Sequence, residues 1–172
     1  MKIALLILVS ALFTAAISGV FGMGGGLIFM GIIATFLTVA EAMVVHGAVQ
    51  SVSNSFRAYL LRDGICWNIL GWQLFGALPA ILLLALASVT LNKGQLFLAL
   101  GLLPLLLWLP KGWLQGDAKK PSNAVLCGAM VMGLNLTAGV AGPALDFFYV
   151  KTTLTRHQIV STKAVTMFAS HM

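Results

Sequence analysis

The sequence predicts an all-α membrane protein with several spanning helices and two internal repeats, each containing a glycine-broken segment. Three observations predict this class. Of the 172 residues, 60% are hydrophobic and 8% are charged, whereas soluble domains carry roughly 25% charged residues. No charged residue stands between Lys2 and Glu41 or between Asp63 and Lys93, and such runs can span hydrocarbon ~30 Å thick. A similar order of segments also occurs twice along the chain.

The first repeat is expected to occupy residues 1–109. Apolar runs bounded by Pro, Gly or polar residues divide it into five predicted helical segments: 3–21, 23–39, 40–61, 69–88 and 95–109. The second segment is barely long enough to cross a bilayer, so it either crosses or dips in and out. The third is unusually polar for a span.

A polar loop over residues 110–122 separates the two repeats and is the only clearly water-soluble stretch. The second repeat, residues 123–172, is expected to be incomplete. It offers a span over 123–142, a short apolar piece over 143–150 and a polar-faced helix from Thr153 onward.

Basic residues beside the spans predict the orientation. The segments 57–68 and 110–122 hold Arg57, Arg62, Lys111, Lys119 and Lys120, whereas Lys93 falls on the opposite side. Because cytoplasmic loops are enriched in Lys and Arg, we expect both segments in the cytoplasm, the N-terminus outside, and a multi-pass protein of the inner cell membrane. The net charge of +6 forms no basic stripe with interleaved aromatics, so no nucleic-acid partner is expected.

The internal repeat becomes visible when the sequence is aligned with itself so that Gly26 is paired with Gly142. In that alignment Met172 meets Phe56, so the second copy stops before any counterpart of residues 57–109. We therefore expect a longer protein, or one completed by another subunit.

Glycines interrupt both copies. The first interruption is the stretch Gly19–Gly26, which ends in the run Gly24 to Gly26, and the second runs from Gly139 to Pro143 and ends in the pair Gly142-Pro143. Irregular backbone at membrane depth is tolerated only where protein surrounds it or a cavity adjoins it. One interpretation is close helix packing through small residues. The other is a binding site, because free N–H groups at a helix start favour anions, and paired interrupted segments mark transporter sites.

A polar stripe follows each interruption. On the predicted helix 40–61 it comprises His46, Gln50, Ser53, Asn54 and Arg57. In the second copy it comprises Gln158, Thr162, Lys163, Thr166 and Ser170. Lipid cannot satisfy such residues, so they should face the bundle interior or an aqueous cavity. Interhelical hydrogen bonds worth ~0.6 kcal/mol explain single members, whereas the paired stripes favour a substrate path.

The charge of the expected ligand can be inferred from the charged residues of the two stripes. Lys163 has no acid at helical spacing to neutralise it, which favours an anion. The predicted substrate-binding residues are Gly24, Gly25, Gly26, His46, Gln50, Asn54, Gly142, Thr162, Lys163 and Thr166. For His46, a proton-relay role and a structural hydrogen-bonding role both stay open.

Sequence signatures of enzymes are missing. The run GMGGG is followed by no GK[ST] and follows no strand of a βαβ unit, so it is neither a P-loop nor a dinucleotide fingerprint. Cys66 and Cys127 show no metal-ligand spacing. We therefore expect no enzymatic activity, no catalytic residue, no metal and no cofactor.

These motifs in combination resemble the sulfite exporter TauE/SafE family. The resemblance rests in the first half on Gly22–Gly26, His46-Gly47, Gln50, Asn54, Arg57-Ala58 and Trp67, and in the second half on Ala141–Asp146, Arg156, Val160–Thr166 and His171. It implies an integral membrane permease of about eight helices that moves small anions such as sulfite, sulfonates or other sulfur compounds. Met30 departs from the Pro that many members carry at a similar position.

The expected function is a permease or exporter of small anions that works by alternating access between the two repeats. Its expected partners are the small anionic substrate and the lipid bilayer. A coupling proton or cation and a homo-oligomeric state stay open. The alternative is a membrane scaffold or assembly subunit without transport activity, whose glycines serve helix packing.

Overall fold

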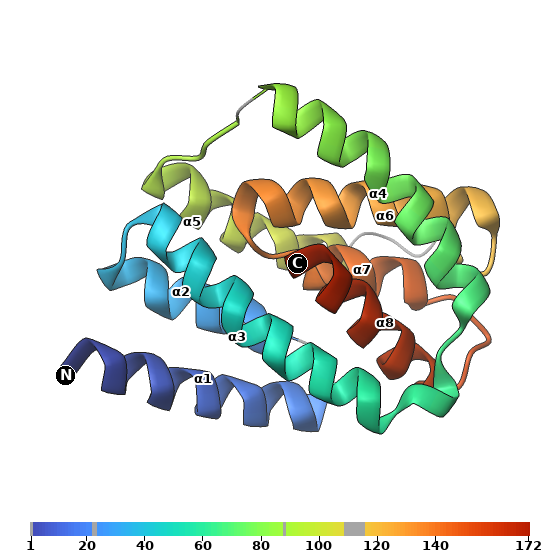
Figure 1. Ribbon diagram of the computed structural model, residues 1–172, viewed down its shortest axis with the longest axis horizontal. Helices are drawn as coiled ribbons and strands as arrows, with labels where there is room; N and C mark the ends of the chain where they lie inside the picture. The colour runs from blue at the N-terminus through green and yellow to red at the C-terminus, as the bar shows by residue number, and fades with distance from the viewer. Residues whose placement is uncertain (1, 22–23, 88, 109–115) are drawn as a thin grey trace.

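A computed structural model describes residues 2–21, 24–87, 89–108 and 116–172 (Figure 1). Over these residues the chain is helical and contains no strand, which confirms the predicted all-α class. The α-helices are α1 (Lys2–Phe21), α2 (Gly25–Phe36), α3 (Val39–Leu60), α4 (Trp67–Ala87), α5 (Lys93–Leu102), α6 (Pro121–Ala138), α7 (Gly142–Tyr149) and α8 (Arg156–His171). Two 3-10 helices, η1 (Arg62–Gly64) and η2 (Leu103–Trp108), complete the set. Gly22, Met23 and residues 110–115 of the predicted polar loop lie outside the described residues.

Most helix ends lie within three residues of the predicted segment ends, with two informative differences. The span predicted over 123–142 ends at Ala138, because Gly139 adopts a left-handed conformation with φ 70°, which glycine tolerates at a helix C-terminus. The segment predicted over 95–109 changes from α to 3-10 geometry at Leu103. The next residue is Pro104, which lacks an N–H donor.

The two polar-faced helices, α3 and α8, begin with the same local device. The side chain of Thr38 accepts a hydrogen bond from the Glu41 N–H, and the Glu41 carboxylate accepts one from the Thr38 N–H. Thr155 and Gln158 make the same reciprocal pair at the start of α8. Such capping boxes satisfy two backbone donors that a helix start leaves free, so both helix starts are fixed by local sequence.

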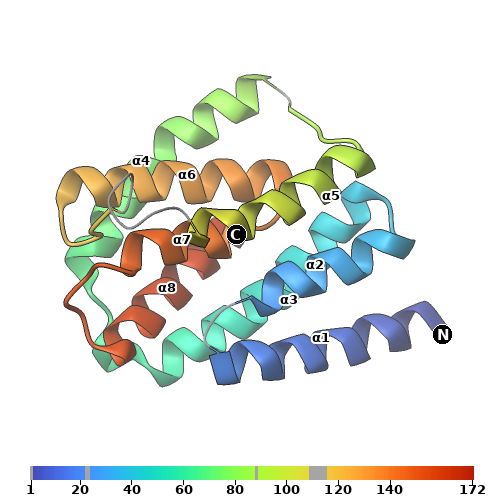
Figure 2. The same ribbon diagram turned by 180° about the vertical axis from the view of Figure 1, so that it is seen from behind.

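Helices from the two halves of the chain pack together in the centre of the molecule. Helix α3 packs against α8, and α4 packs against α6, while α1 lies along α2 at the molecule's edge (Figure 1). The reverse view shows α5 and α7 on the other side (Figure 2). One apolar cluster centres on α2, with buried members that include Phe29, Met30, Ile33, Ala42 and Leu96. A second joins α4, α6 and α7, with buried members that include Ile69, Cys127, Leu145 and Phe148.

Helices α4 and α6 approach each other backbone to backbone. A Cβ atom added at Gly76 would clash with the main chain of Val125, and one added at Gly128 would clash with the main chain of Gln73. Each helix thus places a glycine against the backbone of the other. This is the small-residue packing that brings apolar helices into close contact.

Two helices, α1 and α4, are long and apolar enough to cross a membrane. Many of their large apolar side chains are exposed, for example Leu12 at 64% and Leu83 at 66%. Helix α2 has 12 residues, so it is about 18 Å long and falls short of the ~30 Å of hydrocarbon. Of the two outcomes left open for residues 23–39, the helix length favours a segment that does not cross completely.

Candidate functional site

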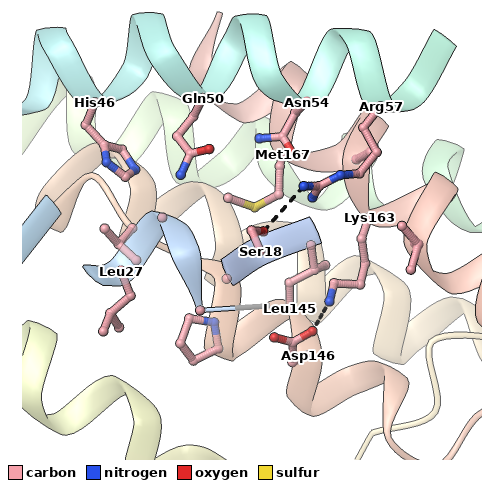
Figure 3. A pocket seen from close by; sticks show the side chains of 17 residues that line it. Ser18, Leu27, His46, Gln50, Asn54, Arg57, Leu145, Asp146, Lys163 and Met167 are labelled. Carbon is pink, nitrogen blue, oxygen red and sulfur yellow. Dashed lines mark hydrogen bonds and ion pairs between the residues drawn. The ribbon is translucent and has the colours of Figure 1, made fainter. Parts of the chain in front are cut away.

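A small polar cavity lies where α3 and α8 meet the starts of α2 and α7 (Figure 3). Its volume is about 70 Å³, which leaves room for a few water molecules or one small polyatomic ion. The polar side chains that line it are Ser18, His46, Gln50, Asn54, Arg57, Asp146 and Lys163. Four of them come from α3 and two from the α7–α8 segment, so both halves of the chain contribute.

Helix α3 presents a row of four polar side chains to this cavity. His46, Gln50, Asn54 and Arg57 follow one another along the same face of the helix, pointing toward α7 and α8 (Figure 3). His46 is 1% exposed and Asn54 is 6% exposed, so both are held inside the protein. Ser53, the fifth member of the predicted stripe, lines a smaller cavity against α1 instead.

Lys163 is not left without a neutralising partner, and that sequence-based expectation is wrong. Its ammonium group forms an ion pair with Asp146 of α7, and both side chains are largely buried (Figure 3). The acid stands 17 residues before the lysine, on another helix, so a search for acids at helical spacing within α8 misses it. The pair leaves Arg57 as a second cation of the cavity, and the described residues place no carboxylate within ion-pair distance of it.

Arg57 is held instead by a neutral partner. Its guanidinium donates a hydrogen bond to the Ser18 hydroxyl of α1 over 3.4 Å (Figure 3). With His46 counted as neutral, the cavity lining carries two positive charges and one negative charge. The electrostatics of the site therefore still favour an anion, with a smaller surplus of positive charge than an unpaired Lys163 would give.

The three consecutive glycines that end the first interruption, Gly24 to Gly26, have three different environments. Gly24 has φ 83° and open space beside its Cα, so it provides the left-handed turn before α2. A Cβ at Gly25 would clash with the Thr14 carbonyl of α1, and one at Gly26 would clash with the Gln50 amide. Gly25 therefore serves packing against α1, while Gly24 and Gly26 line the cavity.

Both short helices start at the cavity. No side chain caps the first N–H groups of α2 or of α7, and the first turn of a helix carries partial positive charge. Gly142 and Pro143 of α7 line the cavity together with Gly24 and Gly26 of α2. Open space adjoins the Gly142 Cα, so this glycine is not needed for close helix contact.

Two of the predicted binding residues, Thr162 and Thr166, face away from the cavity. The Thr162 hydroxyl accepts a hydrogen bond from the Cys66 N–H over 2.9 Å. The Thr166 hydroxyl donates to the Gln73 side-chain carbonyl of α4 over 2.7 Å. Both threonines are buried and join α8 to the α4 side of the molecule, so their role there is structural.

Seven of the ten predicted residues line the cavity: Gly24, Gly26, His46, Gln50, Asn54, Gly142 and Lys163. The predicted binding set did not include Ser18, Arg57 or Asp146. Asp146 carried a usable signal, because it is the only acid in the predicted apolar segment 143–150, and an intramembrane acid usually pairs with a cation.

A buried cluster of polar side chains adjoins the His46 end of the α3 row. The rings of His46 and His171 stand edge to face with centroids 5.5 Å apart, and the Asn135 amide nitrogen donates to His171 Nδ1 over 3.1 Å. The Nδ1 atom of His46 is buried and has no hydrogen-bond partner among the described residues.

Over the part of the chain that the structure describes, the fold and this cavity define a class: an all-helical protein, with two helices apolar enough to cross a membrane, that encloses a small polar site at two helix starts. Comparison of the chain with protein-family models, with curated proteins and with solved structures gave no match.

Proposed function

We propose that this chain is a multi-pass inner-membrane permease for small anions, with sulfite and organosulfonates as the substrate class. One observation carries the proposal: both glycine interruptions and both polar-faced helices meet at a single cavity. These segments form two pairs that lie 117 residues apart in the sequence, from Gly25 to Gly142 and from Val39 to Arg156, and each was expected to belong to a substrate path. The resemblance to the TauE/SafE family supports the choice of sulfur oxyanions as substrates.

The anion chemistry is supported by the donors around the cavity. Two uncapped helix starts direct partial positive charge toward it, and Lys163, Arg57 and the Gln50 amide supply further donors. A volume of about 70 Å³ suits a small oxyanion rather than a large organic solute.

Two structural repeats are part of the proposal, and the helix starts support them. From Gly25 to Gly142, and from Val39 to Arg156, the spacing is 117 residues, one more than in the sequence alignment. At this spacing Lys163 is the counterpart of His46, and Met167 of Gln50; all four line the cavity. A site at the interface of two related halves is typical of alternating-access transporters.

The distribution of charge supports a membrane orientation. The end of α3 and the starts of α4, α6 and α8 lie at one end of the molecule, and the starts of α1 and α5 lie at the other (Figure 1). Within or beside the first set stand Arg57, Arg62, Lys119, Lys120, Lys151 and Arg156. Beside the second set stand Lys2 and Lys93. The positive-inside rule then puts the first end in the cytoplasm and the N-terminus outside.

In the proposed mechanism, the anion binds between the helix starts of α2 and α7 and is held by Lys163, Gln50 and Asn54. The first unit, α1 to α3, and the second, α6 to α8, contact each other mainly through α3 and α8. Rocking of one unit against the other about this contact would open the cavity to each side in turn.

The decisive experiment measures uptake of radiolabelled sulfite by proteoliposomes that contain the full-length protein. Gln50→Ala and Lys163→Ala each remove a donor from the cavity and should lower uptake at least tenfold, since a hydrogen bond to a charged group is worth about 1.5–3 kcal/mol. Ser53→Ala and Lys119→Ala, which alter residues outside the cavity, are the matched controls. Unchanged uptake in both cavity variants would refute the site.

A scaffold without transport activity is the second candidate, favoured by the packing glycines Gly25, Gly76 and Gly128. Gly24→Ala does not separate the two functions, because φ 83° strains any alanine there. Gly142→Ala does, since Gly142 has open space and no left-handed φ. The permease predicts a folded protein with reduced uptake, and the scaffold predicts no change in uptake because none exists. Uptake with and without a proton gradient separates a coupled permease from a channel.

A further inference from the structure

We propose a second oxyanion site in a basic vestibule outside the cavity, held by Arg57 and Arg156, from which the anion passes inward to Lys163. This inference rests on the proposed function and adds a residue, Arg156, and a binding step to it. The vestibule is a separate hollow of about 330 Å³ between the end of α1, the end of α3 and the start of α8. It lies at the end of the molecule where the basic residues gather.

The charge of the vestibule is one-sided. Arg57, Arg156 and His157 line it, and among the described residues no Asp or Glu belongs to its lining. The remaining lining residues are Ser18 and small or apolar residues, so the two arginines supply the charge that can hold an anion there. An anion entering from this end meets positive charge before it reaches the mixed charges of the inner cavity.

Each guanidinium group makes a hydrogen bond within the protein and still has donors to spare. Arg156 donates to the Val20 carbonyl at the end of α1 over 3.3 Å, and Arg57 donates to the Ser18 hydroxyl over 3.4 Å. A guanidinium has five N–H donors, and each of these two is seen to use one. The described residues place no carboxylate within ion-pair distance of either arginine. Such a fork matches the geometry of an oxyanion.

Arg57 connects the vestibule to the inner cavity. Ser18, Arg57 and Val160 line both hollows, so the Arg57–Ser18 hydrogen bond lies on the boundary between them (Figure 3). One guanidinium can therefore hold an anion on the outer side and then, by turning about its side-chain torsions, accompany it toward Lys163. The outer site raises the local concentration of anion at this boundary.

Sulfite uptake by proteoliposomes of neutral lipid tests the outer site. Arg156→Gln should raise the KM for sulfite about fivefold, the size expected from a partly solvated ionic contact, while the maximal rate changes less than twofold. Arg62→Gln is the matched control: Arg62 stands near the same end, but it stacks on Tyr59 at 5.1 Å and lines neither hollow. Its KM should match that of the wild type.

A second pair of variants avoids removing a native side chain. Gly19 lines the vestibule and has open space beside its Cα, so Gly19→Glu and Gly19→Gln should both fold. The two side chains have the same size, and only the glutamate adds a negative charge beside the two arginines, so Gly19→Glu should give a higher KM than Gly19→Gln. Equal KM values for the two variants, or for Arg156→Gln and Arg62→Gln, would overturn the outer site.

A lipid phosphate is a second source of oxyanion at the vestibule, and the composition of the vesicles distinguishes it from free sulfite. If Arg156→Gln alters uptake only in vesicles that contain anionic phosphatidylglycerol, the arginine binds a lipid phosphate, and the proposal fails. An equal effect in neutral and anionic vesicles supports the site for the free anion.

Calorimetric binding of sulfite to the detergent-purified protein gives a readout independent of transport. Wild type should show two sites, and Arg156→Gln should lose the weaker one. Two binding sites without sulfite uptake would refute the permease function and support the outer site. Uptake with a single binding site would support the permease function and refute the outer site.

Discussion

Helix pairs α4–α6 and α3–α8 both bring distant parts of the chain together, but they use glycine and polar residues in opposite ways. Between α4 and α6, Gly76 and Gly128 let the two backbones touch. Between α3 and the α7–α8 segment, polar side chains keep the helices around a cavity, and the neighbouring Gly24 and Gly142 have open space beside them. Glycine content therefore does not separate a packing contact from a binding site. What separates them is the neighbour of each glycine, which is the main chain of another helix at Gly76 and Gly128 and the cavity at Gly24 and Gly142.

The largest loss of stability is expected when the ion pair at the cavity, between Lys163 and Asp146, is removed. Asp146→Asn leaves the Lys163 ammonium buried without a counter-charge, which should cost about 3 kcal/mol of unfolding free energy. Unfolding by SDS titration in mixed micelles measures this loss. The exposed Asp63→Asn should be neutral, and the double variant Asp146→Asn/Lys163→Gln should recover most of the stability. No recovery would mean that the charge pairing is not what the first variant removed.

The second-largest loss of stability is expected from a substitution at the α4–α6 contact. Gly128→Ala places a methyl group against the main chain of Gln73 and should cost about 2 kcal/mol by forcing the helices apart. Gly133→Ala, on the same helix with open space beside it, is the control and should raise the SDS midpoint slightly through helix propensity. If both variants unfold alike, backbone contact does not hold this pair.

A smaller effect is expected where α8 joins α4. Thr166→Val keeps the shape of the side chain but leaves the side-chain carbonyl of the buried Gln73 without its 2.7 Å hydrogen bond, which should cost about 1 kcal/mol. Sulfite uptake should stay at the wild-type level, because Thr166 does not line the cavity. Reduced uptake in a stable Thr166→Val protein would show that Thr166 does contribute to anion binding.

The smallest effect concerns a glycine that serves neither contact. Gly47 lies within α3, has open space beside its Cα and lines neither the polar cavity nor the vestibule. Gly47→Ala should stabilise the protein by about 0.5 kcal/mol through helix propensity alone, with unchanged uptake. A loss of stability in the SDS titration would show that a neighbour packs against this position.

Much of the fold was predictable because apolar run lengths and local stop signals determine helix ends. The cavity face of α3 was predictable as well, since His46, Gln50, Asn54 and Arg57 repeat at helical spacing. What periodicity cannot supply is the identity of the neighbour that a polar residue meets.

Helix α8 illustrates this limit. Lys163 and Thr166 lie on one predicted stripe, yet the lysine pairs with Asp146 and the threonine bonds Gln73. Gln73 was an overlooked signal, since it is a lone amide in the apolar segment 69–88. Such a buried amide needs a partner, but the chain offers several, and only the packing of α8 against α4 selects Thr166.

The ion pair between Lys163 and Asp146 also limits how tightly the cavity can bind an anion. Asp146 already occupies the ammonium group of Lys163, so an arriving anion competes with a carboxylate that is covalently part of the protein. The ligand gains only the difference between its own attraction to the lysine and that of Asp146. Binding is weaker than at an unpaired lysine, and departure is faster, because the carboxylate returns as the ligand leaves. In the proposed permease, which releases its substrate on the far side of the membrane, this competition from Asp146 would speed turnover.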